Sequence, residues 1–509
     1  MTALLGEQLF YRLLEGPGAE SFRLSDEKRS LSGPEFTGKV LGTAGAFASL
    51  GLRPGERAAI RLKNSVEAVL SAFGASRAGG VFTLLAPDLK RPVLEKVLRD
   101  CAPTILVCTA GDEAALQAAG TIPSIKRVVT LGGKVGESLP WEEVEAFQGA
   151  PPDPGRIDLD LAALFYTSGS TGVPKGVMLS HRNLCFTTWS IAEYLGLHAR
   201  DRVLSTLPLS FDYGFFQVPT ALLAGAAVHL EKVFFPGFVL QKIQEMEITG
   251  LPLVPTMLAL VFRMKRPEAY SLSSLRFVTN TAQALPVAAI RKFRSLWPHV
   301  EIFSMYGLTE CTRTLYLDPA EIDEHPESVG RAIPGTRVWI ERPDGSRAEP
   351  GEVGELVVRG SHVMMGYYGD PEATGQVLRR RDPFGPPDLL TGDLFKADRE
   401  GRLYFQGRKD DLIKVEGRKV YPLEVERPAL SHPAVVEACA VGVPDPVQGS
   451  RLKLFLVLRE DVEVDPKEIQ AFLRDYLEEA KIPREIVFKE ELPRTGSGKV
   501  DRRALASEG

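Results

Sequence analysis

The run Tyr-Thr-Ser-Gly-Ser-Thr-Gly-Val-Pro-Lys-Gly-Val, at positions 166–177, concentrates hydroxyls, glycines and one lysine directly after an apolar segment. Gly169, Gly172 and Gly176 can adopt positive φ, so their backbone N–H groups can approach an anion closely. Side-chain donors come from four hydroxyl residues, Thr167, Ser168, Ser170 and Thr171. Lys175 adds a positive charge. These residue types in this order predict a loop that binds phosphate.

This loop differs from the Walker A loop, whose pattern is G-x-x-x-x-G-K-[ST]. Here Gly172 is followed by Val-Pro-Lys-Gly, and Pro174 stiffens the chain beside the lysine. A similar composition is also typical of solvated linkers. The order of the residues, rather than their composition, therefore carries the prediction.

Four further motifs follow downstream. They are Tyr-Gly-Leu-Thr-Glu at 306–310, Thr-Gly-Asp at 391–393, Gly-Arg-Lys-Asp-Asp at 407–411 and Leu-Pro-Arg-Thr-Gly-Ser-Gly-Lys-Val at 492–500. Together with the phosphate loop, they resemble in content and order the motifs of the adenylate-forming superfamily. That superfamily includes acyl-CoA synthetases, luciferases and the adenylation domains of peptide synthetases. The resemblance extends over roughly residues 20–505.

The resemblance implies an ATP-dependent reaction at a carboxylic acid. A carboxylate is a poor electrophile, and adenylation gives it AMP as a leaving group while pyrophosphate departs. The enzyme must neutralise phosphate charge and hold the attacking and leaving oxygens in line. The acyl group then passes to a thiol, either that of coenzyme A or the phosphopantetheine of a carrier protein.

The same resemblance assigns roles to the nucleotide site. Residues 167–175 would hold the β- and γ-phosphates, and Thr309 would contact phosphate. Glu310 would bind Mg²⁺, an ion that takes one or two carboxylates together with phosphate oxygens and water. Tyr306 would lie against adenine, and Asp393 would accept hydrogen bonds from the ribose hydroxyls.

The C-terminal motifs imply a moving catalytic residue. Lys499 follows Gly-Ser-Gly and would bring an ammonium group into a site formed mainly by another domain. Asp410 matches the hinge position, and Gly417 would line the pantetheine tunnel. Arg408 would contact ribose or phosphate before and after the rotation. Gly-Ser-Gly-Lys is not a P-loop, because Val500 replaces the Ser/Thr of that motif.

Two positions in the expected acyl pocket depart from the usual acyl-CoA synthetase pattern. Phe211-Asp212 is similar to the pair by which amino-acid adenylation domains bind an α-ammonium group; alternatively, Asp212 caps a helix beginning near Tyr213. Gln283 stands where the family usually has a small residue. It either shortens the pocket or contacts a polar substrate, so a long alkyl chain is less favoured.

The pattern of apolar segments indicates an α/β fold. Residues 58–62, 65–78, 81–85, 92–100 and 104–108 alternate strand and helix, which predicts a parallel sheet covered by helices. A second such region has expected strands at 202–207, 227–230, 276–280 and 301–305. Antiparallel strands of a small β-rich subdomain are expected within 335–359, where Pro343-Asp344-Gly345 marks a turn.

We expect two domains joined by a hinge. Residues 1–409 would form the large adenylation domain of α/β and β-rich subdomains. Residues 410–509 would form a small mobile α+β domain that carries the catalytic lysine. Its expected strands are 437–443, 452–458 and 485–488, and its expected helix, opened by Asp465-Pro466, covers 467–480.

Composition excludes several other classes of protein. A net charge of −5 over 509 residues argues against a nucleic-acid or anionic-membrane partner. The five scattered cysteines contain no C-x-x-C pair, which favours reduced thiols and a cytoplasmic protein. The N-terminal residues lack a basic segment before Glu7, so no signal peptide is expected, and no apolar run is long enough for a membrane span.

Three alternatives to an acyl-thiol ligase remain at this point. One is an amino-acid adenylation enzyme that loads a carrier protein. Another is a luciferase-like or adenylate-releasing enzyme without thiol transfer. The third is a catalytically silent nucleotide-binding homologue, although the joint presence of Lys175, Glu310, Asp393, Arg408 and Lys499 argues against it.

Overall fold

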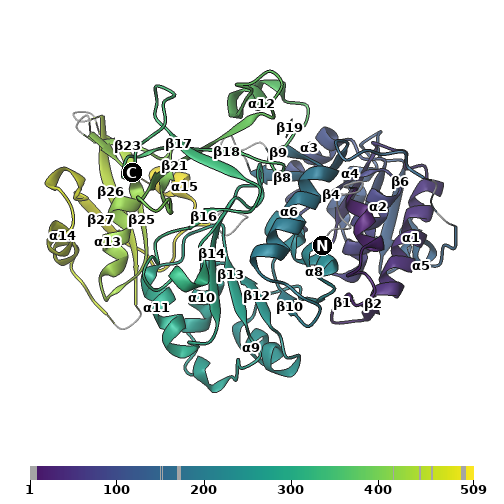
Figure 1. Cartoon of the computed structure of the whole chain (residues 1–509), viewed down its shortest axis with the longest axis horizontal. Coiled ribbons are helices and arrows are strands. Elements are labelled where there is room, and N and C mark those ends of the chain that lie inside the picture. Colours follow the sequence, from purple (N-terminus) through teal and green to yellow (C-terminus); the bar gives the residue numbers. More distant parts are fainter. Residues whose placement is uncertain are drawn as a thin grey trace.

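The computed structural model describes residues 9–149, 151, 153–168, 174–415, 418–445, 449–459, 462–494 and 500–508. Figure 1 shows three groups of elements in the large N-terminal part and a smaller C-terminal group beside them. No helix within the described residues is both long and apolar enough to cross a membrane.

An eight-stranded sheet, mainly parallel, forms the first α/β unit. Its order is β19-β9-β8-β4-β3-β5-β6-β7. The strands are β3 (Arg57–Arg61), β4 (Val81–Leu84), β5 (Ile105–Thr109), β6 (Arg127–Leu131), β7 (Leu139–Pro140), β8 (Leu161–Ser168), β9 (Pro174–Ser180) and β19 (Gly366–Tyr367). The accompanying helices are α1 (Gly33–Ser49), α2 (Val66–Arg77), α3 (Arg91–Cys101), α4 (Glu113–Ala119), α5 (Trp141–Glu145) and α6 (His181–Tyr194). The predicted alternation of strand and helix is confirmed here. Ser65 caps α2, since its side chain accepts from the N–H of Ala68.

A nine-stranded sheet forms the second α/β unit, in the order β16-β15-β14-β13-β12-β10-β11-β1-β2. Its strands are β1 (Arg23–Ser25), β2 (Ser30–Ser32), β10 (Arg202–Ser205), β11 (Ala227–Leu230), β12 (Gly250–Leu253), β13 (Phe277–Asn280), β14 (Glu301–Tyr306), β15 (Leu315–Tyr316) and β16 (Arg331–Ala332). Between them lie α7 (Asp212–Phe215), α8 (Gln217–Ala224), α9 (Pro236–Glu245), α10 (Pro255–Phe262) and α11 (Val287–Leu296). From β14 to β1 the strands run parallel, so their carboxyl ends meet at one edge. In such sheets ligands bind at this edge.

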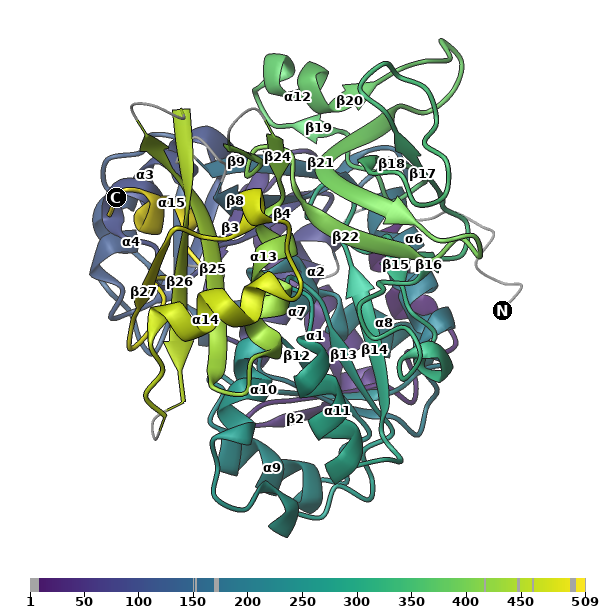
Figure 2. The same ribbon diagram turned by 90° about the vertical axis from the view of Figure 1, so that its left-hand side faces the viewer.

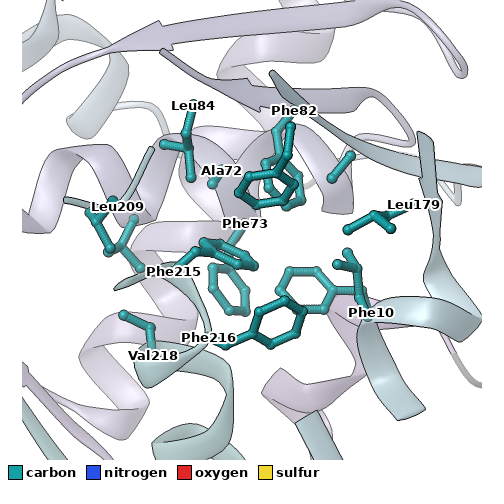
Figure 3. Close-up of a cluster of buried hydrophobic side chains, with 14 of the residues drawn as sticks. Phe10, Ala72, Phe73, Phe82, Leu84, Leu179, Leu209, Phe215, Phe216 and Val218 are labelled. Atoms are coloured by element: carbon teal, nitrogen blue, oxygen red, sulfur yellow. The ribbon is translucent and has the colours of Figure 1, made fainter. Parts of the chain in front are cut away.

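An aromatic core joins the two units. Phe215 of α7 packs against Phe82 of β4 and Phe165 of β8, with ring centroids 5.2 and 5.5 Å apart. Phe10, from the 3₁₀ helix η2 (Phe10–Glu15), lies 4.7 Å from Phe73 of α2. Figure 3 shows the rings of Phe10, Phe73, Phe82 and Phe215 gathered between the helices and strands of both units. Because they are fully buried, the core holds the two sheets together.

A five-stranded antiparallel sheet forms the β-rich subdomain, and the predicted pairing within 335–359 is confirmed. Its strands are β17 (Arg337–Glu341), β18 (Gly354–Arg359), β20 (Leu378–Arg379), β21 (Asp388–Ala397) and β22 (Leu403–Arg408), and α12 (Pro371–Val377) precedes β20. Thr-Gly-Asp lies inside β21 at an irregularity in the pairing with β18. Gly392 has φ 70°, a left-handed conformation that favours glycine.

The C-terminal part has a separate core. Antiparallel β25 (Val435–Asp445) and β26 (Gly449–Leu458) pair, and β27 (Glu485–Phe488) joins β26 in parallel. The remaining elements are the hairpin β23 (Ile413–Val415) and β24 (Arg418–Val420) with helices α13 (Pro422–Ser431), α14 (Pro466–Arg474) and α15 (Arg502–Ala506). In Figure 2 these elements face the viewer and lie in front of both α/β units. The helix opened by Asp465-Pro466 is confirmed but ends at Arg474, six residues earlier than predicted.

Candidate functional site

The two ends of the predicted phosphate loop lie side by side. Strands β8 and β9 form an antiparallel hairpin in which Thr167 pairs with Lys175. The part of the hairpin far from the loop is fixed in the core, because Phe165 and the opposed Val177 are buried. Gly169, Ser170, Thr171 and Gly172 lie outside the described residues, as does the side chain of Ser168. The hairpin thus holds the hydroxyl of Thr167 and the ammonium of Lys175 on neighbouring strands.

Tyr367 links this hairpin to the predicted magnesium ligand. It lies in β19, which pairs with β9. The Lys175 Nζ is 5.0 Å from the centroid of its ring, and its hydroxyl donates to Oε1 of Glu310 at 2.8 Å. Burial and the neighbouring Glu310 raise the pKa of Tyr367, which keeps the hydroxyl protonated as a donor. Lys175 also lies 3.9 Å from Asp370. The structure thus brings Lys175 and Glu310 to the same ring.

Tyr367 is a residue that the sequence reasoning missed. It lies in the run Gly366-Tyr367-Tyr368-Gly369, where a tyrosine pair is flanked by glycines. This run could have suggested a short exposed strand, but nothing in it indicates which distant carboxylate the tyrosine contacts.

The segment after β14 is tightly folded around Thr309 and Glu310. Thr312 has φ 49°, and its hydroxyl lies 2.8 Å from that of Thr187 in α6. A Cβ on Gly307 would stand 1.9 Å from the carbonyl oxygen of Thr312, so only glycine fits there. The N–H of Met364 donates to the Glu310 carbonyl. Both Thr309 and Glu310 are half-buried, so their side chains do not lie within the core.

Tyr306, Asp393 and Arg408, three residues predicted to bind nucleotide, form one network. The Tyr306 hydroxyl donates to Oδ2 of Asp393 at 2.7 Å, and Nε of Arg408 lies 3.5 Å from Oδ1. Asp393 and Arg408 are directly opposed on β21 and β22. The Tyr306 ring packs edge-on against Phe395. Burial and the Asp393 carboxylate raise the pKa of Tyr306 well above its ordinary value.

The residues around Glu310 fit a magnesium ion that is bound mainly by phosphate and water. No group of three or more His, Cys, Asp or Glu side chains suited to a metal is present within the described residues. Glu310 is a half-buried carboxylate near a lysine and a hydroxyl. Since Mg²⁺ takes few protein carboxylates and keeps phosphate and water ligands, this donor set is compatible with it.

Asp212 is buried at the start of α7, which follows β10. It is the first helical residue and Phe211 is the N-cap, so Asp212 does not cap the helix. Its Oδ2 lies 3.9 Å from Nη1 of Arg313, which is buried too. Arg313 is the second residue that the sequence reasoning missed. Its position three residues after Glu310 suggested that Arg313 lies near the site. No rule of sequence spacing, however, pairs Arg313 with Asp212, about a hundred positions earlier.

Gln283 lies in the turn that follows β13. The side-chain amide of Asn280 donates to the Gln283 carbonyl at 2.9 Å, and Ala282 has φ 73°. The Gln283 side chain is half-buried. Hence Asp212 and Gln283 both follow parallel strands at the carboxyl edge of the nine-stranded sheet.

The hinge and lysine predictions fall partly outside the described residues. Asp410 is exposed in the turn after β22. Gly417 and Lys499 lie outside the described residues, but Arg494 and Val500 on either side of the lysine segment form an antiparallel bridge. Arg494 also binds Glu437 of β25 at 2.7 Å. The two ends of the lysine segment are therefore fixed on the C-terminal sheet.

Comparison with known proteins decides the family. Residues 13–368 match the AMP-binding enzyme family, and residues 424–499 match the C-terminal domain of AMP-binding enzymes. The chain belongs to the AMP-binding enzyme family.

Two relatives and one solved structure show the breadth of this family. A feruloyl-CoA synthase of Amycolatopsis is 35% identical over 478 residues, 92% of each chain. An L-proline–[L-prolyl-carrier protein] ligase of Pseudomonas fluorescens is 30% identical over 510 residues, 99% of each chain. ATP-bound MatB from Rhodopseudomonas palustris superimposes with a TM-score of 0.90 at 27% identity over 99% of each chain.

This member of the family is an AMP-forming acid–thiol ligase. It uses ATP to convert a carboxylic acid to an acyl-adenylate with release of pyrophosphate, and then transfers the acyl group to a thiol. The predicted α/β architecture, with its β-rich subdomain and smaller C-terminal domain, is confirmed.

Proposed function

We propose that this ligase activates an aromatic carboxylic acid with Mg²⁺-ATP and transfers it to coenzyme A. The observation that carries the site assignment is the convergence of two networks, Lys175–Tyr367–Glu310 and Tyr306–Asp393–Arg408. Residues 306 and 310 belong to one short segment, which supports the proposal that both networks would contact the same nucleotide.

In this proposal the first network acts on the triphosphate. Thr167 and Lys175 donate to the β- and γ-phosphates, with Ser168, Gly169, Ser170, Thr171 and Gly172 completing the loop. Thr309 donates to phosphate, and Glu310 holds the magnesium ion. When bound, that ion would neutralise charge on the phosphate oxygens during displacement. Tyr367 orients the Glu310 carboxylate through its hydroxyl.

The second network holds the nucleoside. Tyr306 lies along adenine, while Asp393 accepts hydrogen bonds from the ribose hydroxyls. Arg408, at the end of β22, pairs with Asp393 and can exchange that contact for phosphate. Lys499 supplies positive charge to the developing oxygens in adenylation, and rotation about Asp410 then removes it. Gly417 permits close passage of pantetheine.

The choice of an aromatic acid rests on two observations. The feruloyl-CoA synthase relative covers 92% of the chain. Beyond the nucleotide residues, aromatic side chains surround the buried Arg313: its guanidinium lies 4.3 Å from the Tyr213 ring, and Tyr194, which stacks on Tyr316, is also close to it. Flat aromatic surfaces favour an aryl group over an extended alkyl chain.

Carboxylate-dependent exchange of pyrophosphate into ATP tests the proposal. Aryl acids should support exchange at least ten times better, in kcat/KM, than alkyl acids of equal length. Coenzyme A should then yield a thioester and free AMP. If alkyl acids are preferred, the aromatic assignment is wrong although the reaction class stands.

A second candidate is an amino-acid adenylation enzyme that loads a carrier protein. The match to the prolyl-carrier-protein ligase relative covers 99% of the chain, and Phe211-Asp212 is similar to the pair by which amino-acid adenylation domains bind an α-ammonium group. Arg313 beside Asp212 opposes this, because it would repel an ammonium group. Amino acids in the exchange assay, followed by a holo carrier protein as acceptor, separate the two candidates.

A further inference from the structure

Asn64 joins the two α/β units at the place where the expected acyl pocket begins. It lies between β3 and α2 of the first unit and is buried, with an exposed fraction of 4%. Three hydrogen-bond partners of its side chain belong to the second unit. The aromatic core holds the two units together through apolar contacts, whereas Asn64 connects them through hydrogen bonds.

The side-chain amide of Asn64 matches backbone groups that follow two parallel strands. Its Nδ2 donates to the carbonyls of Leu207 and Glu231, each at 2.9 Å, and its Oδ1 accepts from the N–H of Leu209 at 2.9 Å. Residues 207 and 209 follow β10, and residue 231 follows β11 directly. Backbone groups beyond the end of a strand have left the ladder of the sheet and need other partners when they are buried. A single side chain that bonds three of them fixes the course of the chain at this edge.

The segment that Asn64 holds leads directly into Asp212. Residues 206–211 connect β10 to α7, and Phe211 is the N-cap of α7. A Cβ on Gly214 would stand 2.2 Å from the carbonyl oxygen of Pro208, so α7 packs directly on the segment. Because this packing is close, a shift of the segment would also move the start of α7.

The same segment lies apart from the two nucleotide networks. It follows β10 at the carboxyl edge of the nine-stranded sheet, where ligands bind in folds of this type, and Gln283 follows β13 at the same edge. The hydrogen bonds of Asn64 described above involve no residue of either network. A displacement of residues 207–212 should therefore weaken the binding of the acid more than the binding of ATP.

We propose that Asn64 is a positioning residue for the carboxylic acid, because it holds residues 207–212 in their acid-binding arrangement before the acid arrives. The proposal rests on the function proposed above, since it takes the segment around Asp212 as a wall of the acyl pocket. It adds a position that controls acid binding from the first α/β unit, through the backbone of the second unit rather than through contact with the substrate.

Asn183 is the matched control, because its amide has the same bonding pattern at another segment. Asn183 has an exposed fraction of 6%. Its Nδ2 donates to the carbonyls of Ser361 and Val363 at 2.7 and 2.9 Å, and its Oδ1 accepts from the N–H of Ser180 at 2.8 Å. Residues 361–363 lead to β19 rather than to α7. Replacing either asparagine by alanine thus removes three hydrogen bonds of similar length from different parts of the protein.

Pyrophosphate exchange with cinnamic acid and with nonanoic acid tests the effect on the substrate. With the acid that the wild-type enzyme prefers, Asn64→Ala should raise KM for the acid about tenfold while KM for ATP stays within about twofold, because the acid-binding segment alone is displaced. Asn183→Ala should leave KM for the acid within about twofold of wild type. An unchanged KM for the acid in Asn64→Ala, or equal increases in both variants, would overturn the proposal.

Hydrogen exchange tests the positioning itself. In the free wild-type enzyme the amide hydrogens of residues 207–211 should exchange slowly, and ATP with the acid should change their rate by less than about threefold, since the segment is already held. Asn64→Ala should accelerate exchange at 207–211 about tenfold or more and leave 361–364 unchanged, whereas Asn183→Ala should do the reverse. Fast exchange in the free wild-type enzyme that slows on binding would overturn the proposal, and this comparison decides even if Asn64→Ala does not fold.

Failure of the inference differs from failure of the proposed function. If nonanoic acid is preferred to cinnamic acid, the aromatic assignment is wrong, and the inference is decided by KM for nonanoic acid. If cinnamic acid is preferred but its KM does not respond to Asn64→Ala, the inference is wrong and aryl activation stands. If neither acid supports exchange while ATP binds, the proposed function fails, and the inference fails with it.

Discussion

Tyr367 is an uncharged residue that lies between two charged groups of the candidate site. It faces Lys175 with its ring and Glu310 with its hydroxyl. A tyrosine in this place keeps a lysine and a glutamate close without a direct ion pair. The two charges therefore do not neutralise each other, although Lys175 also lies 3.9 Å from Asp370, and both can act on the phosphates and the metal ion that would bind here.

Tyr367→Phe tests this positioning role. Loss of the 2.8 Å hydrogen bond to Glu310 should lower kcat of pyrophosphate exchange about tenfold, about 1.4 kcal/mol, and raise the Mg²⁺ concentration required for half-maximal rate. Tyr368→Phe is the control, because Tyr368 lies near Arg57 rather than Glu310. An unchanged Mg²⁺ dependence in Tyr367→Phe would show that Glu310 is oriented by other contacts.

Two buried histidines predict acid sensitivity. Burial lowers the pKa of His362 to about 3 and that of His181 to about 4, from ordinary values near 6.5. Below pH 6.5 the unfolded chain binds protons that the folded protein does not, so the free energy of unfolding falls between pH 6.5 and about 3. His362 stacks on the ring of Phe186, so its imidazole lies in an apolar environment.

His362→Phe should remove part of this sensitivity. Between pH 7 and pH 5 the free energy of unfolding of the variant should fall by about 2 kcal/mol less than that of the wild-type protein. Urea unfolding at both pH values measures it. His198→Gln, a change at a half-exposed histidine, should retain the wild-type difference. An equal loss in His362→Phe would mean that other groups cause the acid sensitivity.

At the scale of elements, hydrophobic periodicity was a reliable guide where strands are continuous and apolar. Strands β3, β4, β5 and β11 and helices α2 and α3 were predicted within two residues at each end. Strand β12 was missed because Pro252 lies within it, and proline argues against a central strand. It is accommodated because β12 pairs with β10 only at Gly250–Val203.

The candidate site likewise contains residues that could be predicted from sequence and contacts that could not. Residues within one ordered motif, such as Tyr306 and Glu310, could be predicted from sequence because their spacing along the chain is itself the signal. Contacts such as Tyr367 to Glu310 and Arg313 to Asp212 could not, since they depend on how separate strands are paired. Sequence periodicity indicates which residues face a core, but not which loops meet at the edge of a sheet.

Because the segment after β14 is tightly packed, we predict that one methyl group added at Gly307 strongly destabilises the protein. In Gly307→Ala the new Cβ would stand 1.9 Å from the Thr312 carbonyl oxygen, so the backbone must shift. We expect a loss of about 3 kcal/mol in the free energy of unfolding, as for severe overpacking. Exchange activity should also fall, because Thr309 and Glu310 lie in this segment.

Gly375→Ala is the matched control for that change. Gly375 lies exposed in α12, and no atom stands within 4 Å of a Cβ placed there. Replacing a helical glycine by alanine should raise stability by about 0.5–1 kcal/mol. Urea unfolding of both variants measures the contrast. Equal stability of Gly307→Ala and the wild-type protein would mean that the segment adapts freely.

At the scale of the whole molecule, few described polar contacts join the C-terminal part to the rest. Arg427 of α13 donates to the Phe405 carbonyl of β22 at 2.9 Å and lies 3.7 Å from Glu327. Asp410 is exposed between β22 and β23. A junction of this kind suits a domain that changes its orientation between two half-reactions.

Asp410→Pro tests whether that change is required. Proline fixes φ near −65°, so it should restrict rotation at the junction while leaving each domain folded. Pyrophosphate exchange should stay within about threefold of wild type, whereas thioester formation with coenzyme A should fall at least tenfold. Asp410→Ala, which retains backbone freedom, should support both. A parallel loss of both half-reactions in Asp410→Pro would argue against a hinge at this residue.

The Asp212–Arg313 pair also constrains how this enzyme can evolve. Replacing either residue alone removes an opposite charge that lies 3.9 Å from the other buried charge, which is destabilising. Replacing both together removes that penalty, so the two positions should show epistasis. Substitutions that persist at these two positions should therefore occur together, whereas the aromatic core that joins the two sheets can remain unchanged.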